Sequence, residues 1–365
     1  MRFNELVTSP RPYARAGVDN SRSGRAVAGL VEVLAGIDPG RPSRSALASG
    51  HYASVLRLDD RTGLALATDG VGTKIIVAEA LERYDTVGID CVAMNANDLV
   101  CVGAEPIALL DYVAVEEADP EMLAAIARGL RAGAEAAGIE IPGGELAQLP
   151  ELVRGHPSPR GFDLVGTCAG LVQLDRLVTG ATVEPGDAVI GLPSTGVHSN
   201  GLTLARRVLP DLSEAPPELG GRTVGEELLE PTAMYVRAVL ALLGEPGIDV
   251  RGLAHITGDG LLNLLRVEAD VGYRIDAPLP RPAVFDLIAA RGGVAPGELY
   301  EVFNMGCGFC CVVPHPHAEA AVELLDSFHP GTAVIGEVTE LAGTVDISAE
   351  GLVGHREHGF EARGR

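Results

Sequence analysis

The segment Thr68–Lys74, with the sequence Thr-Asp-Gly-Val-Gly-Thr-Lys, combines residue types that bind phosphate and metal ions. Its two glycines let the backbone approach an anion closely, while Asp69 offers a carboxylate and Thr73 a hydroxyl. Lys74 is the only lysine among the 28 basic residues, and it provides a compact point charge that the planar arginine side chain does not copy. Because Mg²⁺ takes one or two carboxylates together with phosphate oxygens, the segment favours a nucleotide polyphosphate with Mg²⁺. The spacing of a P-loop is absent, and a tight turn after a strand is the alternative.

Two more acidic residues stand in or beside apolar segments. Asp98 lies inside an apolar helical run from Cys91 to Val102. A buried unpaired carboxylate is costly, so Asp98 must cap, pair or bind a metal unless it faces solvent. Glu145 ends the tripeptide Gly143-Gly144-Glu145, after a short apolar run typical of a strand end. It would be a third acidic group near the edge of a sheet, available to a second metal or to an ammonium group, and a surface turn is the alternative.

Two segments combine histidine, hydroxyl and glycine residues at the start of an expected helix. The first, Ser194–Gly201, contains His198 and precedes a helix that begins at Leu202. A helix N-terminus with such donors favours phosphate binding, and His198 could add a hydrogen-bond donor or a general acid. A plain capped loop is the alternative. The second segment is His255–Gly260, where Asp259 could be only an N-cap and the histidine only a buried core residue.

The six cysteines favour a reduced, buried role rather than a disulfide framework. Cys307 and Cys310 have the C-x-x-C spacing, but no second such pair exists to complete a zinc site. Because these thiols and Cys311 lie in an apolar run, we expect them to pack in the core.

The composition limits the class of protein. The 365 residues predict two domains, or one large one, at roughly 150 residues each. The formal net charge of −22 opposes binding to nucleic acid and to anionic membranes. Residues 1–18 lack the apolar stretch of a signal peptide, and no apolar run is long enough to span a membrane. We therefore expect a cytoplasmic protein with neither a nucleic-acid nor a membrane partner.

The hydrophobic pattern predicts intermixed strands and helices, and hence α/β sheets. The best-marked helix begins at Asp119-Pro120 and ends at Gly138. Other helices are expected at Asp85–Val102, Leu202–Leu209, Pro231–Leu243, Leu261–Val267, Ala283–Arg291 and His317–Phe328. Strands are expected at Leu64–Thr68, Ile107–Val115, Phe162–Leu174, Ala188–Leu192, Val271–Ile275, Phe303–Val313 and Ala333–Val338. Turn residues near Arg176–Asp187 divide the chain into domains at 1–175 and 176–345, followed by a polar tail at 346–365 that we expect to fray from Gly351.

Ten short motifs follow one another along nearly the whole chain. They are Tyr13–Asp19, Thr68–Lys74, Asp85–Asp90, Asn97–Leu99, Gly103–Pro106, Gly143–Glu145, His198–Gly201, Leu229–Thr232, His255–Gly258 and Phe303–Gly306. In this order they resemble the motifs of the aminoimidazole ribonucleotide (AIR) synthetase family, the phosphoribosylformylglycinamidine cyclo-ligases of purine biosynthesis.

The resemblance implies a fold, a partner and a reaction. The fold has two α/β domains, and the N-terminal sheets of two subunits pair into a barrel, which makes a homodimer. In the reaction, ATP phosphorylates the formyl oxygen of formylglycinamidine ribonucleotide. The amidine nitrogen then attacks the same carbon, the imidazole ring closes, and ADP, phosphate and AIR are the products.

The same resemblance assigns residues to this chemistry, because phosphoryl transfer needs positioning and charge neutralisation. The expected catalytic residues are Lys74, which would meet the triphosphate, Asp98, His198 and His255. The expected Mg²⁺ ligands are Asp69, Asp98 and Glu145. The expected ATP contacts are Gly50, His51, Tyr52, Asp69, Gly70, Gly72, Thr73 and Lys74. The expected substrate or phosphate contacts are His198, Ser199, Asn200, Gly201, Thr257 and Gly258, and which of the two loops holds the ribose phosphate stays open.

Three departures from the family pattern stand out. Ser49–Ser54 replaces a glycine-dense stretch, which predicts a stiffer nucleotide lid in which His51 or Tyr52 substitutes for the usual aromatic residue. Asp259 occupies the middle glycine of the family's His-Ile-Thr-Gly-Gly-Gly, and so adds a negative charge near an expected anion site. Leu146 follows Glu145 where threonine is usual.

Other proteins of the same superfamily fit less well. Selenophosphate synthetase would call for a reactive cysteine near the N-terminus, and the first cysteine here is Cys91. The hydrogenase-maturation protein would call for a C-terminal cysteine, and this chain ends in arginine. Thiamine-monophosphate kinase is a further relative. An ATP-binding paralogue with another phosphoryl acceptor, or without turnover, is the alternative function, and a metal or redox module built on Cys307, Cys310 and Cys311 is a third.

Overall fold

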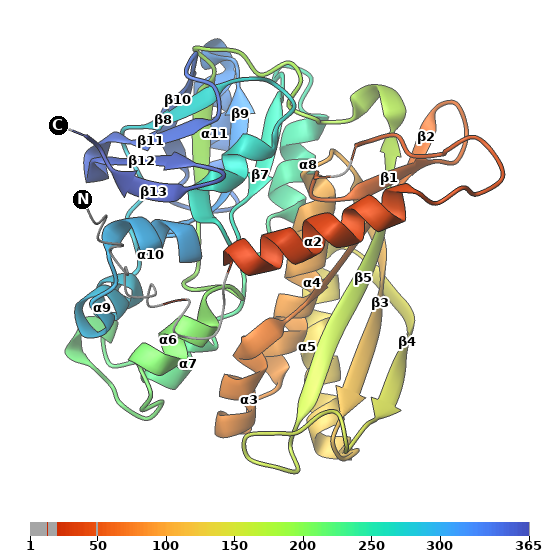
Figure 1. Cartoon of the computed structure of the whole chain (residues 1–365), viewed down its shortest axis with the longest axis vertical. Coiled ribbons are helices and arrows are strands. Elements are labelled where there is room, and N and C mark those ends of the chain that lie inside the picture. The colour runs from red at the N-terminus through yellow and green to blue at the C-terminus, as the bar shows by residue number, and fades with distance from the viewer. Residues whose placement is uncertain (1–12, 14–19, 49, 365) are drawn as a thin grey trace, which may run out of the picture.

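The computed structural model describes Tyr13, residues 20–48 and residues 50–364, and it contains two sheets (Figure 1). The first sheet has the strand order β1-β2-β5-β3-β4, and only its β3–β4 pair is parallel. Its strands are β1 Ser54–Arg57, β2 Thr62–Gly70, β3 Glu105–Val115, β4 Glu140–Gln148 and β5 Phe162–Gln173. The second sheet has the order β13-β12-β11-β8-β10-β6-β9-β7. Its strands are β6 Ala188–Pro193, β7 Gly252–His255, β8 Gly272–Ile275, β9 Cys307–Val313, β10 Ala333–Thr339, β11 Thr344–Ile347, β12 Leu352–His355 and β13 Gly359–Ala362.

Two long helices, α4 (Asp85–Val100) and α5 (Pro120–Ala137), cover one face of the first sheet (Figure 1). They cross in backbone contact, because glycines line the crossing point. A Cβ on Gly88 would lie 2.2 Å from the Leu130 nitrogen, and one on Gly129 would lie 2.1 Å from the Asp85 oxygen. Any side chain at these positions would therefore push the helices apart.

Helix α5 shows the end signals that its sequence predicts. The Asp119 side chain accepts hydrogen bonds from the backbone N–H groups of Glu121 and Met122, and Pro120 occupies the first turn. Gly138 ends the helix in the left-handed conformation, with φ of 76°.

The opposite face of the first sheet is apolar and exposed. Ile107, Leu110, Tyr112 and Leu171 from β3 and β5 are all accessible to solvent there. Alternate residues of the same strands, such as Leu109 and Cys168, are fully buried under α4 and α5. The sheet therefore carries hydrophobic residues on both sides.

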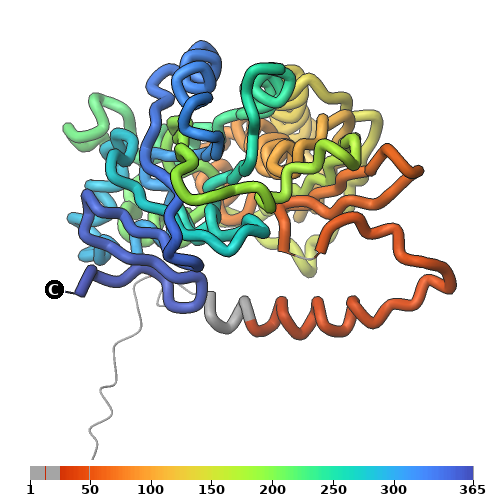
Figure 2. The backbone as a smooth tube through the Cα atoms, turned by 90° about the horizontal axis from the view of Figure 1, so that it is seen from above, coloured from red at the N-terminus to blue at the C-terminus, as the bar shows by residue number. Residues whose placement is uncertain are grey.

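Helices of the second half surround the larger sheet and fill the space between the halves. They are α6 Leu202–Val208, α7 Val224–Leu228, α8 Val236–Gly244, α9 Ala283–Gly292, α10 Pro296–Val302 and α11 Ala318–Asp326. The buried apolar residues of both halves form one continuous core. Among the described residues, α2 (Asn20–Ala35) and α3 (Ile75–Leu81) precede α4. Figure 2 shows α2 running along the outside of the molecule, where Val27, Leu30 and Leu34 are exposed.

Most of the expected elements are present, and the mixed α/β fold is confirmed. The expected helix Leu261–Val267 is instead a 3-10 helix, η4, over Gly260–Arg266. The helix expected from Pro231 begins only at Val236, because the preceding turn is held by hydrogen bonds to α4. The expectation that the chain frays from Gly351 was wrong: β12 and β13 pair with each other, and the buried Phe360 anchors them.

The six cysteines are free and buried, as their apolar surroundings predict. Helices long and apolar enough to cross a membrane are absent from the part of the chain that the structure describes. The last strand of the first sheet, β5, ends at Gln173, and the first strand of the second sheet, β6, begins at Ala188. A domain boundary between residues 175 and 176 lies between these two strands and stays a proposal.

Candidate active site

Three of the predicted residues, Asp69, Asp98 and His255, come together where the two halves meet. Asp69 lies near the end of β2, Asp98 lies in α4 and His255 ends β7. The Asp98 carboxylate is 2.8 Å from Nδ1 of His255, which is fully buried. Burial, followed by the nearby charge of Asp98, raises the pKa of Asp69. Two partly desolvated carboxylates therefore lie near each other, and a histidine fixes the orientation of one of them.

This pair of carboxylates fits Mg²⁺. Carboxylate oxygens are the ligands that Mg²⁺ prefers, and it usually completes its shell with water and phosphate oxygens. Asp69 and Asp98 also repel each other, and a cation between two neighbouring carboxylates offsets such repulsion. Within the described residues no group of three or more His, Cys, Asp or Glu side chains is arranged to hold a metal ion. Two carboxylates would therefore hold Mg²⁺ here only together with oxygens of a bound ligand or of solvent.

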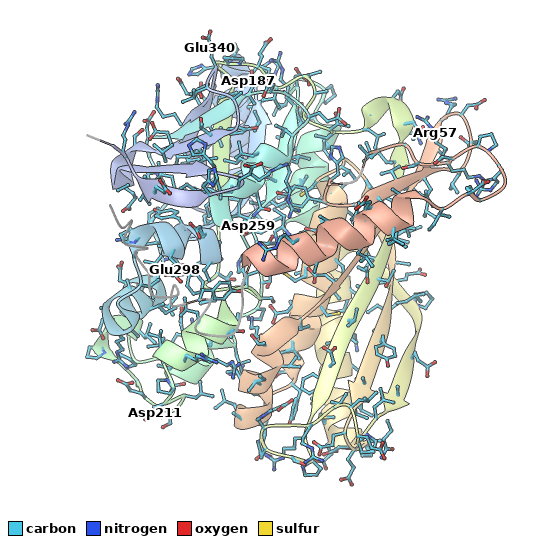
Figure 3. All side chains as sticks on the ribbon, in the orientation of Figure 1. Arg57, Asp187, Asp211, Asp259, Glu298 and Glu340 are labelled. Atoms are coloured by element: carbon cyan, nitrogen blue, oxygen red, sulfur yellow. The ribbon has the colours of Figure 1, made fainter. Side chains whose placement is uncertain are left out.

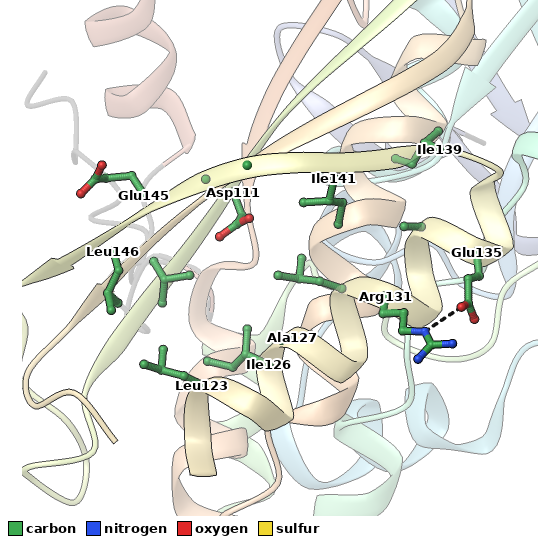
Figure 4. Close-up of a pocket in the computed structure, with 15 residues that line it drawn as sticks. Asp111, Leu123, Ile126, Ala127, Arg131, Glu135, Ile139, Ile141, Glu145 and Leu146 are labelled. Atoms are coloured by element: carbon green, nitrogen blue, oxygen red, sulfur yellow. Dashed lines mark hydrogen bonds and ion pairs between the residues drawn. The ribbon is translucent and has the colours of Figure 1, made fainter. Parts of the chain in front are cut away.

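Glu145 does not join this pair. It lies on the exposed edge strand β4, opposite Tyr112 of β3. Figure 4 shows it at one end of a cavity of about 730 Å³ between β4 and α5, pointing away from Asp111. Asp111 lines that cavity, and burial raises its pKa. Within this chain Glu145 therefore does not form a third ligand beside Asp69 and Asp98, because two strands, β5 and β3, separate β4 from β2. The sequence predicted that Glu145 lies at a strand end but not which edge of the sheet that strand occupies.

Lys74 is placed differently from the expectation that it meets a triphosphate. The side chain is fully buried, and its ammonium group donates to Asp90 at 2.9 Å and to the Glu230 carbonyl at 2.5 Å. Asp90 also accepts hydrogen bonds from the backbone N–H and the hydroxyl of Thr232, at 2.7 and 2.6 Å. Burial lowers the pKa of Lys74, and Asp90 opposes that effect. The lysine therefore joins α4 to the turn before α8, and it ties the two halves of the molecule together.

His198 is a buried, neutral imidazole. Its Nε2 accepts from the backbone N–H groups of Thr195 and Ala233, at 3.1 and 3.5 Å, so the ring proton is assigned to Nδ1. Burial lowers the pKa of His198 well below its usual value, and the neighbouring His255 and Lys74 add to the effect. Nδ1 has no hydrogen-bond partner among the described residues. The histidine is thus a preset hydrogen-bond donor rather than a general acid that carries a positive charge.

The two predicted loops lie side by side. Asn200 Oδ1 is 3.7 Å from the position that a Cβ on Gly258 would occupy. Ser199 bonds to the Thr232 hydroxyl at 3.1 Å, which connects the first loop to the turn that Asp90 holds. Gly201 has a left-handed φ of 72° and packs directly on Phe303, so no side chain fits there. Thr257 is half-buried in the second loop.

The predicted nucleotide lid, Gly50 to Tyr52, packs on the second half of the chain. His51 Nε2 lies 3.2 Å from the Glu268 carboxylate, and the Tyr52 hydroxyl donates to the Asn263 carbonyl at 3.2 Å. The Arg266 guanidinium lies 4.7 Å above the Tyr52 ring. Burial raises the pKa of Tyr52, and the charge of Asp98 contributes to the shift. The lid therefore reaches close to the Asp69–Asp98 pair. Gly70, Gly72 and Thr73 follow Asp69, and Thr73 bonds to Thr203 of α6 at 3.0 Å.

Several residues of this region were given no role of their own from the sequence. Asn97 donates to the Ala233 carbonyl and accepts from the Tyr235 N–H, both at 2.9 Å, and so fixes the start of α8. Asp90 was seen only as part of a motif, although a carboxylate in an apolar helix is a signal for a buried partner. Arg266 and Arg356 gave no sequence signal, because their convergence depends on tertiary packing.

Sequence families match both halves of the chain. Residues 50–172 match the family described as AIR synthase related protein, N-terminal domain, and residues 184–355 match its C-terminal domain. The phosphoribosylformylglycinamidine cyclo-ligase of Methanothermobacter thermautotrophicus is 46% identical over 342 residues, which cover 92% of this chain and 97% of that protein. The protein of the same name from Thermococcus kodakarensis is 47% identical, with 89% and 96% covered. That from Methanocaldococcus jannaschii is 41% identical, with 94% and 95% covered.

Solved structures share the fold at lower identity. The hydrogenase maturation protein HypE in complex with ATP has a TM-score of 0.59 at 22% identity, covering 85% of this chain and 87% of that one. AaThiL complexed with AMPPCP and TMP has a TM-score of 0.58 at 17% identity, covering 82% and 87%. At such identities the likeness concerns the fold alone. The level and the extent of identity to the curated relatives decide the family: the chain belongs to the phosphoribosylformylglycinamidine cyclo-ligase, or AIR synthetase, family, and it is an enzyme of the ligase class.

Proposed function

We propose that this protein closes the imidazole ring of AIR with ATP. ATP transfers its terminal phosphoryl group to the formyl oxygen of formylglycinamidine ribonucleotide and leaves as ADP. The amidine nitrogen then attacks the formyl carbon, loses a proton, and expels the oxygen as inorganic phosphate. The observation that carries the proposal is the Asp69–Asp98–His255 cluster, with the two loops of the motif pattern beside it.

Asp69 and Asp98 are the residues that would hold Mg²⁺, which when bound neutralises the charge on the phosphates of ATP. His255 acts as a positioning residue, because its Nδ1 fixes one oxygen of Asp98 at 2.8 Å. His255 is itself fully buried, so it contacts the nucleotide only through Asp98. Loss of His255 should therefore weaken metal binding rather than abolish a proton transfer.

His198 acts as a positioning residue in the same site. The residue is only 2% exposed, and its neutral Nε2 joins the first loop at Thr195 to the turn at Ala233. Lys74 acts at a distance by holding Asp90 and the turn at Thr232, which in turn positions Ser199. Both residues gain their roles from burial, since solvent would compete for the same bonds.

Other features support the proposed partner and location. The exposed apolar face of the first sheet, with Ile107, Leu110, Tyr112 and Leu171, supports pairing of two such sheets into the barrel of a homodimer. Free buried thiols and the family's small-molecule substrate support a cytoplasmic location.

The alternative is an ATP-binding paralogue without ring closure, and Asp259 in the second loop is the observation behind it. A steady-state assay separates the two. Wild-type protein is supplied with ATP, Mg²⁺ and formylglycinamidine ribonucleotide, while AIR and ADP are measured together. We expect equal amounts of both, a loss of at least about a hundredfold in Asp98→Asn, and no change in the exposed control Asp60→Asn. ADP or bound ATP without AIR would overturn ring closure.

A further inference from the structure

A cavity of about 340 Å³ lies between the lid, η4 and the end of β12. Arg266, at the end of η4, and Arg356, directly after β12, both line it, together with His51 of the lid and Asp259. The volume is at the lower end of the range for small-molecule sites. Figure 3 shows Asp259 near the middle of the molecule.

The two arginines are unusual in so acidic a chain. The net charge is −22, yet neither Arg266 nor Arg356 forms an ion pair with a carboxylate of the described residues. The Arg266 guanidinium lies over the Tyr52 ring, and Arg356 donates to the Leu265 carbonyl. Oriented guanidinium groups without a carboxylate partner are suited to a phosphate, because their N–H groups can bind two oxygens at once.

A buried amide side chain lines the same cavity. Asn263 is only 2% exposed, and its amide group donates to the carbonyls of Gly258 and Gly260 at 2.7 and 2.8 Å. Its Oδ1 has no partner among the described residues, although buried amide oxygens are usually satisfied. The side chain therefore needs a donor from a ligand or from water. The Asp259 carboxylate offers a second acceptor on the same wall.

We propose that this cavity binds the phosphate-bearing end of a sugar phosphate. Arg266 and Arg356 hold the phosphate, while Asn263 Oδ1 and Asp259 accept hydrogen bonds from hydroxyl or N–H groups of the ligand. Within the proposed function, on which this assignment of a substrate rests, the ligand is the ribose 5-phosphate of the ribonucleotide rather than the polyphosphate of ATP. Gly50 and His51, which the family resemblance assigns to ATP, then contact the sugar phosphate instead. Asp259 then contributes an acceptor where the family has glycine, instead of repelling the substrate.

Calorimetric titration with ribose 5-phosphate tests the site without turnover, with ribose and ATP as comparison ligands. We expect ribose 5-phosphate to bind, ribose to bind far more weakly, and Arg356→Gln to weaken ribose 5-phosphate at least about tenfold. Arg356 is exposed, so its replacement leaves the fold intact. A second variant, Arg266→Lys, keeps the positive charge but loses the guanidinium that can bind two phosphate oxygens at once. The exposed Arg128→Gln on α5 is the matched control.

Kinetics with the same variants separate the two sources of phosphate. We expect Arg356→Gln to raise the KM for the ribonucleotide at least about tenfold and to leave the KM for ATP unchanged. Weaker ATP binding with unchanged ribose 5-phosphate binding would overturn the assignment, and so would the absence of ribose 5-phosphate binding. If ribose 5-phosphate binds as expected but wild-type protein forms no AIR, the proposed function fails while the sugar-phosphate site stands.

Discussion

Replacement of Lys74 by methionine should unfold the molecule more readily, because it removes one half of a buried ion pair. Both side chains are completely inaccessible to solvent. Asp90 would keep its two bonds from Thr232 but lose the Lys74 ammonium at 2.9 Å. Breaking a buried pair from one side costs about 3–5 kcal/mol, a large fraction of the roughly 5–15 kcal/mol that stabilises a typical protein.

Urea denaturation followed by circular dichroism measures this loss, and Asp90→Asn in the Lys74→Met background provides the matched test. Asparagine can still accept from Thr232 but carries no charge, so the double variant should recover at least about 1 kcal/mol of the lost stability. A loss below about 1 kcal/mol in Lys74→Met, accompanied by a large fall in ATP affinity, would refute this role. It would instead place the ammonium on the triphosphate.

Three further changes have defined outcomes. Gly129→Ala should destabilise the fold by about 2 kcal/mol or more, measured by urea denaturation, since its Cβ would lie 2.1 Å from the Asp85 carbonyl oxygen. Asp259→Gly should raise the free energy of unfolding by a few tenths to about 1 kcal/mol, because glycine adopts the φ of 71° at this position without strain. The same variant should bind ribose 5-phosphate more weakly, because it lacks the carboxylate acceptor. The free energy of unfolding should stay constant above pH 6.5 and fall as the pH drops below it. Burial lowers the pKa of His198, so below pH 6.5 the unfolded histidine takes up a proton that the folded protein does not. The expected slope for this one group is up to about 1.4 kcal/mol per pH unit.

A specific result would contradict each of these three predictions. A Gly129→Ala protein as stable as wild type would mean that α4 and α5 do not cross in backbone contact. A less stable Asp259→Gly protein would mean that the aspartate makes a stabilising bond in its loop. His198→Gln removes the ionisable ring, so an unchanged slope of stability against pH would show that His198 is not the group responsible.

Local signals predicted the elements better than the site. Helix α5 was readily predicted because Asp119-Pro120 and Gly138 act within a few residues of the helix ends. The closing strands β12 and β13 were missed, since their polar residues alternate around few apolar anchors such as Phe360. The η4 segment has an apolar pattern that does not separate a 3-10 helix from an α-helix.

The site depended on contacts that no local pattern contains. Asp98 and His255 were each expected to matter, but their pairing joins residues 157 positions apart. Lys74 was singled out as the only lysine, yet a nearby acid at Asp90 decides its role, and burial of that pair follows from the packing of α4 against the turn at Thr232. Arginines 266 and 356 were not predicted, because they converge only when η4 and β12 lie side by side.

The fate of the formyl oxygen tests the proposed reaction most directly. Formylglycinamidine ribonucleotide labelled with ¹⁸O in its formyl group is converted by the wild-type protein with ATP and Mg²⁺, and the released phosphate is examined by mass spectrometry. Phosphorylation of the formyl oxygen predicts one ¹⁸O atom in the phosphate for each AIR formed, because that oxygen leaves with the phosphoryl group. Unlabelled phosphate, with the ¹⁸O recovered in water, would contradict the account.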